Sequence, residues 1–438
     1  MTVSGVQWLV TAEVLNGRIG EGHWIEGDRN SEGRGESAEA RRPADVPAAA
    51  MTDVLTVGRA HRPTDSVDTC STPPSLMWTQ FETNPFPVYA RLRRDFPLVR
   101  DESLDAWVVS RYADVRAALC DPRLAPPDNT LRTARADHTP LRTVLSAALR
   151  NHAPTNLRRT AFGAAEELAW RAAAEIRRCG STDLVPTFCE ALPVQVLTAA
   201  LGLPSADAPR LRLSCNAAAS KPRLACLEPH IAARRSEPGD DLLSTLCAAE
   251  IEGRPLTDQE IQRMCAVLLT AGARTTEKAL ALFLTNLVDH PDAQAAVAEK
   301  PDLVHAAWAE SLRRDPPTHV VFRRATEAVD LPSGTIPAGA TVACLPASAN
   351  RDPAHFADPD HFDIRRPERD EFAASAENLA FGAGERSCLG AHLARLLGET
   401  VSALLHHLPH LRWTDGFTPT PQGLINRSTP RLRVTARP

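Results

Sequence analysis

The segment 257–290 limits the possible folds more than any other part of the sequence. Thr257 and Glu260 have the spacing of a capping box, in which each side chain accepts the other residue's backbone N–H. Apolar residues then recur up to the break at His290-Pro291, which predicts one helix of about 33 residues, roughly 50 Å long. Because its middle is apolar on nearly all sides, we expect that middle to be buried in a large domain.

The rest of the sequence predicts a mainly helical protein. Strand-like runs, bounded by turn residues, occupy residues 106–110, 318–325 and 341–345. The expected fold class is therefore mainly α with small β-sheets, an α+β arrangement. Residues 1–72 are rich in Gly, Glu, Arg and Ala and poor in large apolar side chains, so we expect a disordered extension there. Residues 73–438 should form one domain.

Composition excludes several classes of function. The net charge of −5 argues against a nucleic-acid-binding protein, which needs a basic surface. No run reaches the roughly 18 apolar residues of a membrane span, and the apolar run near the start lacks the features of a signal peptide. The ten cysteines show no paired spacing, which favours reduced thiols. We therefore expect a cytoplasmic protein that binds neither nucleic acid nor membrane.

The strongest chemical signal is a glycine-rich loop that contains a cysteine. It reads Phe381-Gly-Ala-Gly-Glu-Arg-Ser-Cys388-Leu-Gly390 and leads into a predicted helix. Its glycines permit a tight loop and a close approach of the backbone to a flat ligand. At the start of a helix, a cysteine is stabilised as a thiolate by the helix dipole and by nearby N–H groups.

This loop resembles the haem-binding signature of the cytochrome P450 family, Phe-Gly-x-Gly-x-(His/Arg)-x-Cys-x-Gly. The matching residues are Phe381, Gly382, Gly384, Arg386, Cys388 and Gly390. The resemblance implies that Cys388 is the axial iron ligand of haem b, and a thiolate there donates electron density that favours cleavage of the O–O bond. The alternative is a buried structural thiol.

Further pieces of the sequence resemble the family in the same order. Glu310 and Arg313 match its Glu-x-x-Arg pair, which fixes the core beneath the haem, although an i,i+3 ion pair alone is a weak signal. Residues 350–365 resemble the segment that approaches the haem loop. The resemblance extends over residues 76–438 and implies the P450 fold, a helical domain with small sheets around a buried haem.

The two haem propionates need cationic partners. By resemblance these are His138, Arg142, Arg323 and Arg386. Each of them alone is equally consistent with a solvated surface charge. Arg324 competes with Arg323, because a shift of one residue in the match exchanges them.

Residues 271–276 resemble the motif Ala-Gly-x-(Glu/Asp)-Thr-Thr on the family's oxygen-side helix. The resemblance places Ala271 and Gly272 beside the haem, where the glycine leaves room for dioxygen, and it implies that the Thr275 hydroxyl orients a water. The alternative is that Thr275 bonds back to a carbonyl of its own helix.

Arg274 stands where the motif has an acid that supplies protons. An arginine stays protonated at any working pH, so it cannot relay protons as a carboxylate does. Three interpretations remain open. Arg274 binds a carboxylate or another acceptor on the substrate, or it pairs with Glu277 while water carries the protons, or the reaction depends less on the usual relay, as in oxidative coupling or desaturation.

Two segments that form the roof of the substrate pocket in the family are short here, namely residues 124–138 and 204–240. This predicts either a more open site, suited to a bulky or carrier-tethered substrate, or a different local fold.

The resemblance implies a monooxygenase that uses dioxygen to oxidise a small organic molecule, in a hydroxylation or coupling step of specialised metabolism. Since the chain shows no flavin or iron–sulfur segment, we expect electrons from a separate ferredoxin and its reductase. Two other functions remain open. One is a non-catalytic partner or activator of another enzyme, and the other is a peroxide-dependent enzyme with an acidic substrate.

Overall fold

The computed structural model describes residues 72–77, 84–127, 138–151, 154–215, 225–366 and 377–436. Contacts divide the chain between Pro73 and Pro74, and the fold below is that of the unit Pro74–Pro438. Apart from Thr72, the extension predicted over residues 1–72 lies outside the described residues, so both its disorder and its boundary stay predictions.

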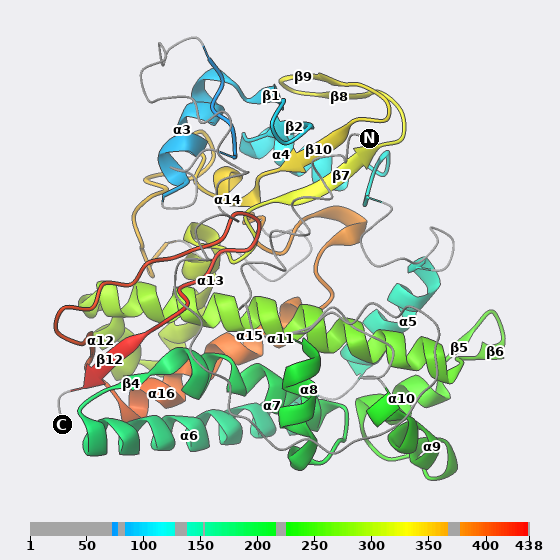
Figure 1. Cartoon of the computed structure of the whole chain (residues 1–438), viewed down its shortest axis with the longest axis vertical. Coiled ribbons are helices and arrows are strands. Elements are labelled where there is room, and N and C mark those ends of the chain that lie inside the picture. Colours follow the sequence, from blue (N-terminus) through cyan, green and yellow to red (C-terminus); the bar gives the residue numbers. More distant parts are fainter. Residues whose placement is uncertain are drawn as a thin grey trace, which may run out of the picture. The chain divides into compact units, whose positions relative to one another are not determined.

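Helices make up most of this unit, and the longest is α11 (Asp258–Asp289), which runs across the middle of Figure 1. The others are α3 (Phe86–Asp95), α4 (Tyr112–Cys120), α5 (His138–Asn151), α6 (Pro154–Cys179), α7 (Ala191–Ala200), α8 (Ala208–Cys215), α9 (Glu228–Ser236), α10 (Leu242–Ala248), α12 (Pro291–Glu299), α13 (Val304–Arg314), α14 (Pro346–Ala349), α15 (Ala391–Glu399) and α16 (Val401–His407). A π-helical turn, Val185–Cys189, precedes α7.

The predicted long helix is confirmed, with both ends close to those expected. The Thr257 hydroxyl accepts from the Glu260 N–H at 3.3 Å, and the Glu260 carboxylate accepts from the Thr257 N–H at 2.8 Å, which completes the capping box. The helix ends at Asp289, before the proline at position 291. The carboxyl-terminal residues 279–288 are buried on every side, as the continuous apolar sequence requires.

The middle of α11 corrects one expectation, because it is not buried on all sides. Thr270 and Ala271 are exposed, and Val267, Arg274 and Thr275 are partly exposed. These residues recur at intervals of three and four, so they form one stripe on the helix surface. We call residues 267, 270, 271, 274, 275 and 278 the open stripe of α11. The polar and small residues of the sequence therefore follow this open side of the helix.

The strands predicted from the sequence meet in one five-stranded sheet with the order β1-β2-β10-β7-β3. Its strands are β1 (Leu98–Asp101), β2 (Ala106–Val109), β3 (Leu124–Ala125), β7 (Val321–Ala325) and β10 (Thr341–Cys344). β2 and β10 are parallel, and the other neighbours are antiparallel. The predicted runs at 106–110, 318–325 and 341–345 are confirmed as β2, β7 and β10, although β7 begins three residues later than expected.

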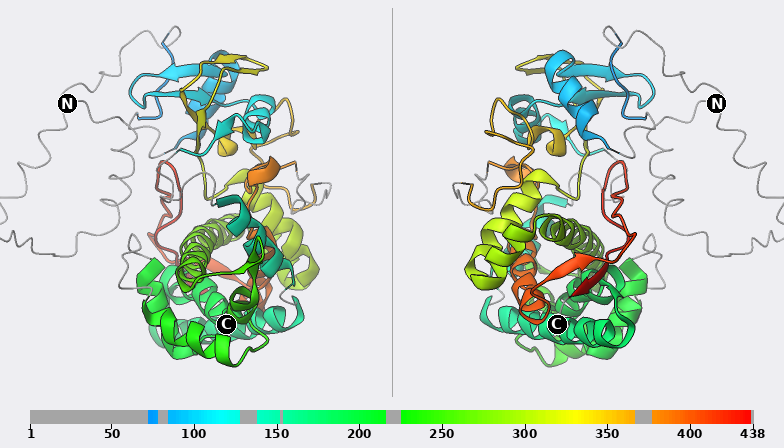
Figure 2. Two further views of the ribbon diagram at one scale, coloured as in Figure 1. Left: turned by 90° about the vertical axis from the view of Figure 1, so that its right-hand side faces the viewer. Right: turned by 90° about the vertical axis from the view of Figure 1, so that its left-hand side faces the viewer.

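Smaller sheets complete the fold. They pair β11 (Leu411–Trp413) with β12 (Arg433–Ala436) and β4 (Thr182–Asp183), β5 (Glu250–Ile251) with β6 (Arg254–Pro255), and β8 (Val329–Leu331) with β9 (Gly334–Ile336). Figure 2 looks nearly along α11 and shows the five-stranded sheet on one side of it and α6 and α16 on the other.

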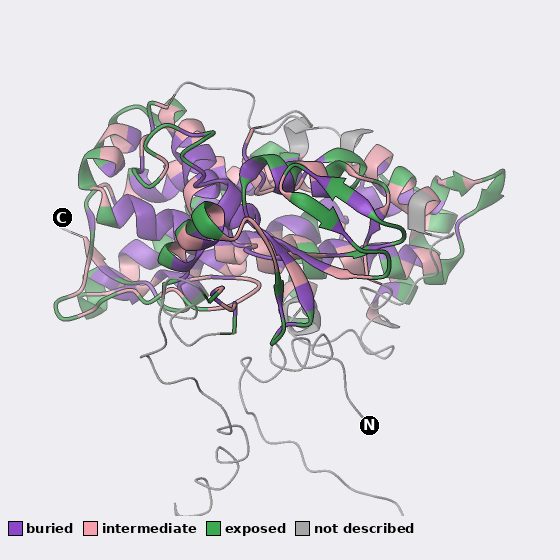
Figure 3. Cartoon of the chain, turned by 90° about the horizontal axis from the view of Figure 1, so that it is seen from above, coloured by how far each residue is buried: buried purple, intermediate pink, exposed green. Residues whose placement is uncertain are grey.

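The hydrophobic core follows the central helices. One cluster of buried side chains joins α6, α11, α13, α15 and α16, and a second joins α5, α7, α10 and the amino-terminal half of α11. Figure 3 shows this distribution, with buried residues along the central helices and exposed residues on the β5–β6 hairpin. Within the described residues, no helix is both long enough and apolar enough to cross a membrane.

Candidate active site

Residues 381–390 form a tight loop that presents Cys388 in front of α15. Gly382 and Gly384 have φ values of +72° and +70°, which lie in the left-handed region that favours glycine. The loop is closed by a hydrogen bond of 2.8 Å from the Cys388 N–H to the Phe381 carbonyl. It also lies against the end of α4, since a Cβ added at Gly384 would come within 3.0 Å of the Cys120 Cα.

Cys388 has exposed surface, although protein surrounds its sulfur. Burial of the thiol raises its pKa, while the Gly390 N–H, which donates to the sulfur, and the cation of Arg142 act in the opposite direction. The thiolate expected from the sequence stays a prediction.

Arg142 lies near Cys388, Arg386 belongs to the same loop, and Arg323 lies near Arg386. Arg142 of α5 donates to the carbonyl of Ser387 and is close enough to the sulfur for their charges to interact. Burial lowers the pKa of Arg142 and of Arg323, and nearby Arg386 lowers both further. Among the described residues, none of the three arginines has an acidic partner within ion-pair distance.

Arg323 has a buried guanidinium nitrogen without a hydrogen-bond partner among the described residues. This atom is Nε, whereas Nη1 donates to the Phe322 carbonyl at 3.0 Å. A buried cation without a counter-charge is costly, so this site suits an anionic ligand. The alternation of side chains in β7 buries Arg323 and exposes Arg324. α5 begins at His138, whose side chain lies outside the described residues.

The open stripe of α11 carries Ala271, Arg274 and Thr275. The Thr275 hydroxyl donates to the Ala271 carbonyl at 2.6 Å, so the back-bonding considered from the sequence is present. Its oxygen can still accept a hydrogen bond from another group. Arg274 is partly exposed on this stripe.

Gly272 lies near α7 as well as on α11. A Cβ added at this position would lie 3.4 Å from a methyl group of Leu197, which is an ordinary van der Waals contact. The placement of Gly272 beside the haem, implied by the resemblance, stays a prediction. Ala271, one residue earlier, belongs to the open stripe.

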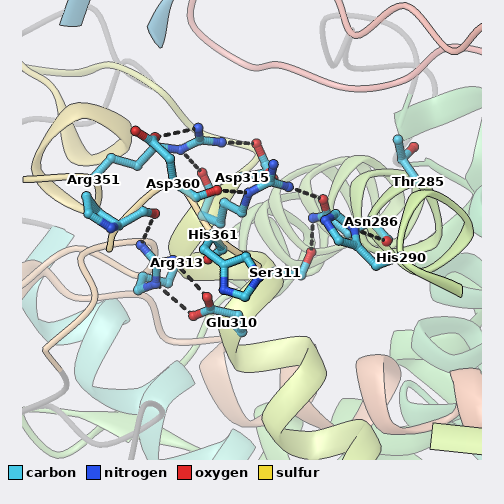
Figure 4. Close-up of polar contacts among 12 residues, drawn as sticks. Thr285, Asn286, His290, Glu310, Ser311, Arg313, Asp315, Arg351, Asp360 and His361 are labelled. Atoms are coloured by element: carbon cyan, nitrogen blue, oxygen red, sulfur yellow. Dashed lines mark hydrogen bonds and ion pairs between the residues drawn. The ribbon is translucent and has the colours of Figure 1, made fainter. Parts of the chain in front are cut away.

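Glu310 and Arg313 form a buried ion pair on α13. Two hydrogen bonds of 2.7 and 2.8 Å join the guanidinium to the carboxylate, and both side chains are at most 3% exposed. Arg313 also donates to the carbonyls of Asn350 and Pro359 at 2.8 and 2.9 Å. Figure 4 shows this pair beside the second network of Arg351, Asp315 and Asp360. The pair therefore fixes α13 to the segment that leads to the Cys388 loop.

Two residues of this network were not assigned a role from the sequence. Arg366 donates to Glu310 at 3.1 Å, and Asn350 links Arg313 to the backbone of Leu379. Arg366 is 56 residues away from its partner in the chain. Neither contact is predictable from the sequence, because hydrogen bonds between residues far apart in the chain produce no periodic pattern.

Comparison with known proteins agrees with this geometry. Residues 221–415 match the family model of Cytochrome P450. The chain is 32% identical over 382 residues to the cytochrome P450 monooxygenase PikC of Streptomyces venezuelae, covering 78% of this chain and 89% of PikC. It is 29% identical over 396 residues to pulcherriminic acid synthase of Bacillus subtilis, covering 82% of this chain and 97% of that protein.

Solved structures show the same fold. The structure of CYP109E1 from Bacillus megaterium in complex with testosterone has a TM-score of 0.71 and 25% identity, covering 81% of this chain and all of that one. The complex of P450BioI with a hexadecenoyl-ligated acyl carrier protein has a TM-score of 0.68 and 26% identity, covering 81% of this chain and 98% of that one.

The chain therefore belongs to the cytochrome P450 family. It is an oxidoreductase, and the interpretation as a non-catalytic partner is not supported. The cofactor of the family is haem, iron protoporphyrin IX, and the residues present fit it. A cysteine faces an open side of the site, and three cations without acidic partners among the described residues surround its loop, which is the donor set that an iron with two propionates requires.

Proposed function

We propose that this enzyme oxidises a small organic molecule with dioxygen, with Cys388 as the axial ligand of the haem iron, in a tailoring step of specialised metabolism. The observation that carries the proposal is the position of Arg142, which donates to the Ser387 carbonyl beside Cys388, with Arg386 in the same loop and Arg323 near Arg386. Electrons come from a separate ferredoxin and its reductase. The cytoplasmic location inferred from the sequence stays a prediction.

When bound, the haem supplies the redox chemistry that activates dioxygen. The protein's own residues bind the haem propionates and orient water or substrate. Arg142, Arg323 and Arg386, together with His138, hold the two propionates through charge-assisted hydrogen bonds. The Thr275 oxygen, whose proton is directed to the Ala271 carbonyl, accepts a hydrogen bond from water or substrate on the open stripe of α11.

Similar structures support the proposal of a bulky or carrier-tethered substrate. They include MycG in complex with mycinamicin IV and P450BioI in complex with an acyl carrier protein.

Arg274 favours a substrate with an anionic group. It lies on the open stripe, and Lys278 follows on the same stripe four residues later, so both cations belong to one side of the helix. With Arg274→Glu, we expect the dissociation constant of an anionic substrate to rise by roughly 10- to 150-fold, because a hydrogen bond to a charged group contributes about 1.5–3 kcal/mol.

Titration of the haem spectrum with substrate measures this constant. Arg263→Glu, at an exposed position of the same helix, is the matched control and should leave the constant unchanged. Unchanged affinity in Arg274→Glu, with better coupling of oxygen consumption to product, would mean that Arg274 only replaces the relay acid.

The source of oxidising equivalents separates the proposed enzyme from a peroxide-dependent one, which Arg274 would also suit by orienting an acidic substrate. We expect product when substrate is incubated with ferredoxin, its reductase, NADPH and dioxygen. Product with hydrogen peroxide alone, and none with the ferredoxin system, would contradict the ferredoxin proposal.

The two adjacent arginines of β7 test the propionate assignment. Arg323→Leu should increase haem dissociation by roughly tenfold or more, because it removes a charge-assisted hydrogen bond to a carboxylate. Arg324→Leu, on the exposed side of the same strand, should leave it unchanged. Transfer of haem to excess apomyoglobin measures both rates. Equal effects of the two substitutions would contradict the assignment.

A further inference from the structure

Asn350 connects the Glu310–Arg313 pair with the segment that enters the Cys388 loop. Its backbone oxygen accepts from Arg313 at 2.8 Å, while its side-chain Oδ1 accepts from the Leu379 N–H at 2.7 Å. Asn350 and Leu379 are both fully buried. Because water does not compete at such a position, these hydrogen bonds fix geometry more strongly than exposed ones.

From Leu379, two backbone hydrogen bonds lead directly to Cys388. The Leu379 carbonyl accepts from the Gly382 N–H at 3.0 Å, and the Phe381 carbonyl accepts from the Cys388 N–H at 2.8 Å. Each bond joins main-chain atoms of a tight loop. A displacement of Leu379 therefore shifts the loop that carries the thiol.

The side-chain nitrogen of Asn350 is a second, independent observation. Nδ2 is buried and has no hydrogen-bond partner among the described residues. An unpaired buried donor costs free energy, which a leucine of similar volume would avoid. This unfavourable free energy indicates that the Oδ1 atom of the same amide, which accepts from the Leu379 N–H, has a role that a leucine could not fill.

We propose that Asn350 is a positioning residue for the thiolate ligand: its side-chain oxygen holds Leu379, and thereby the Cys388 loop, in register with the Glu310–Arg313 pair. The inference rests on the proposed role of Cys388 as the iron ligand. Asn350 itself touches neither substrate nor cofactor in this account. Its effect passes through the backbone of residues 379–388.

The test compares the carbon monoxide difference spectra of the reduced haem proteins. Asn350→Leu should move the absorption from the red-shifted Soret band of a thiolate ligand toward the shorter-wavelength band of a protonated or lost thiol. The ratio of the two bands should change roughly fivefold or more, as expected for one buried hydrogen bond. Asn350→Asp keeps the acceptor for Leu379, so the folded protein should retain the thiolate band, although the buried carboxylate should lower its stability.

Asn286→Leu is the matched control. Asn286 is also buried and holds α13 through Ser311 and Arg314, but it makes no contact with the loop. We expect this variant to be less stable and to keep the thiolate band. If Asn350→Leu does not fold, the comparison is made between Asn350→Ala, which should lose the band, and Asn350→Asp.

A thiolate band in Asn350→Leu or Asn350→Ala as strong as that of the unmodified protein would overturn the inference, and so would equal losses in Asn350→Ala and Asn350→Asp. Both outcomes differ from a failure of the proposed function, in which the unmodified protein itself shows no thiolate band.

Discussion

Replacement of Cys388 by alanine should abolish substrate oxidation. Removal of a residue that merely supports a metal ligand typically costs 10- to 100-fold in activity or affinity, so loss of the ligand itself should cost more than about 100-fold. The structure offers no substitute, because Cys388 is the one described thiol in the loop. Product formation with the ferredoxin system measures the effect.

Cys120→Ala is the control for this substitution. Cys120 is also an exposed thiol, and it contacts the same loop at Gly384. Since it has no assigned role in binding or catalysis, its replacement should leave turnover close to that of the unmodified protein. Persistent turnover in Cys388→Ala would contradict the thiolate assignment.

Replacement of Arg313 by leucine should destabilise the fold by about 3–5 kcal/mol, because it leaves the Glu310 carboxylate buried without its main partner. Two further hydrogen bonds, to the carbonyls of Asn350 and Pro359, disappear with the guanidinium. We expect a lower urea midpoint and loss of haem, since the pair supports the segment that enters the Cys388 loop.

An exposed ion pair supplies the contrast. Arg171 and Glu167 form an i,i+4 pair on α6 with both side chains more than half exposed. Arg171→Leu should cost less than about 1 kcal/mol, because water screens such pairs. A cost for Arg313→Leu as small as that for Arg171→Leu would mean that the Glu310–Arg313 pair contributes little to the fold.

The elements with strong local patterns were predictable from the sequence. The capping box and the long apolar run predicted α11 within one residue at each end, and short extended runs bounded by turn residues predicted β2 and β10. The Cys388 loop was predictable for a different reason. Its glycines and cysteine lie close together in the sequence, so the conformation of the loop depends mainly on one short motif.

Features that depend on tertiary contacts were not predictable. The open stripe of α11 is set by what packs around the helix, so the expectation of a buried middle did not identify the side that stays exposed. The contact of Gly272 with Leu197 depends in the same way on which side of α11 faces α7. Arg366 binds Glu310, which is distant in the sequence, and the Asn350 side chain binds a backbone N–H. Neither kind of contact produces a periodic sequence pattern.

The carbon monoxide difference spectrum of the reduced, unmodified protein tests the central claim most directly. If Cys388 ligates the haem iron, the Soret band shifts to the red position that distinguishes a thiolate ligand from histidine or water. A folded protein that binds haem and lacks this shifted band would contradict the assignment of Cys388, and with it the proposed oxidation chemistry.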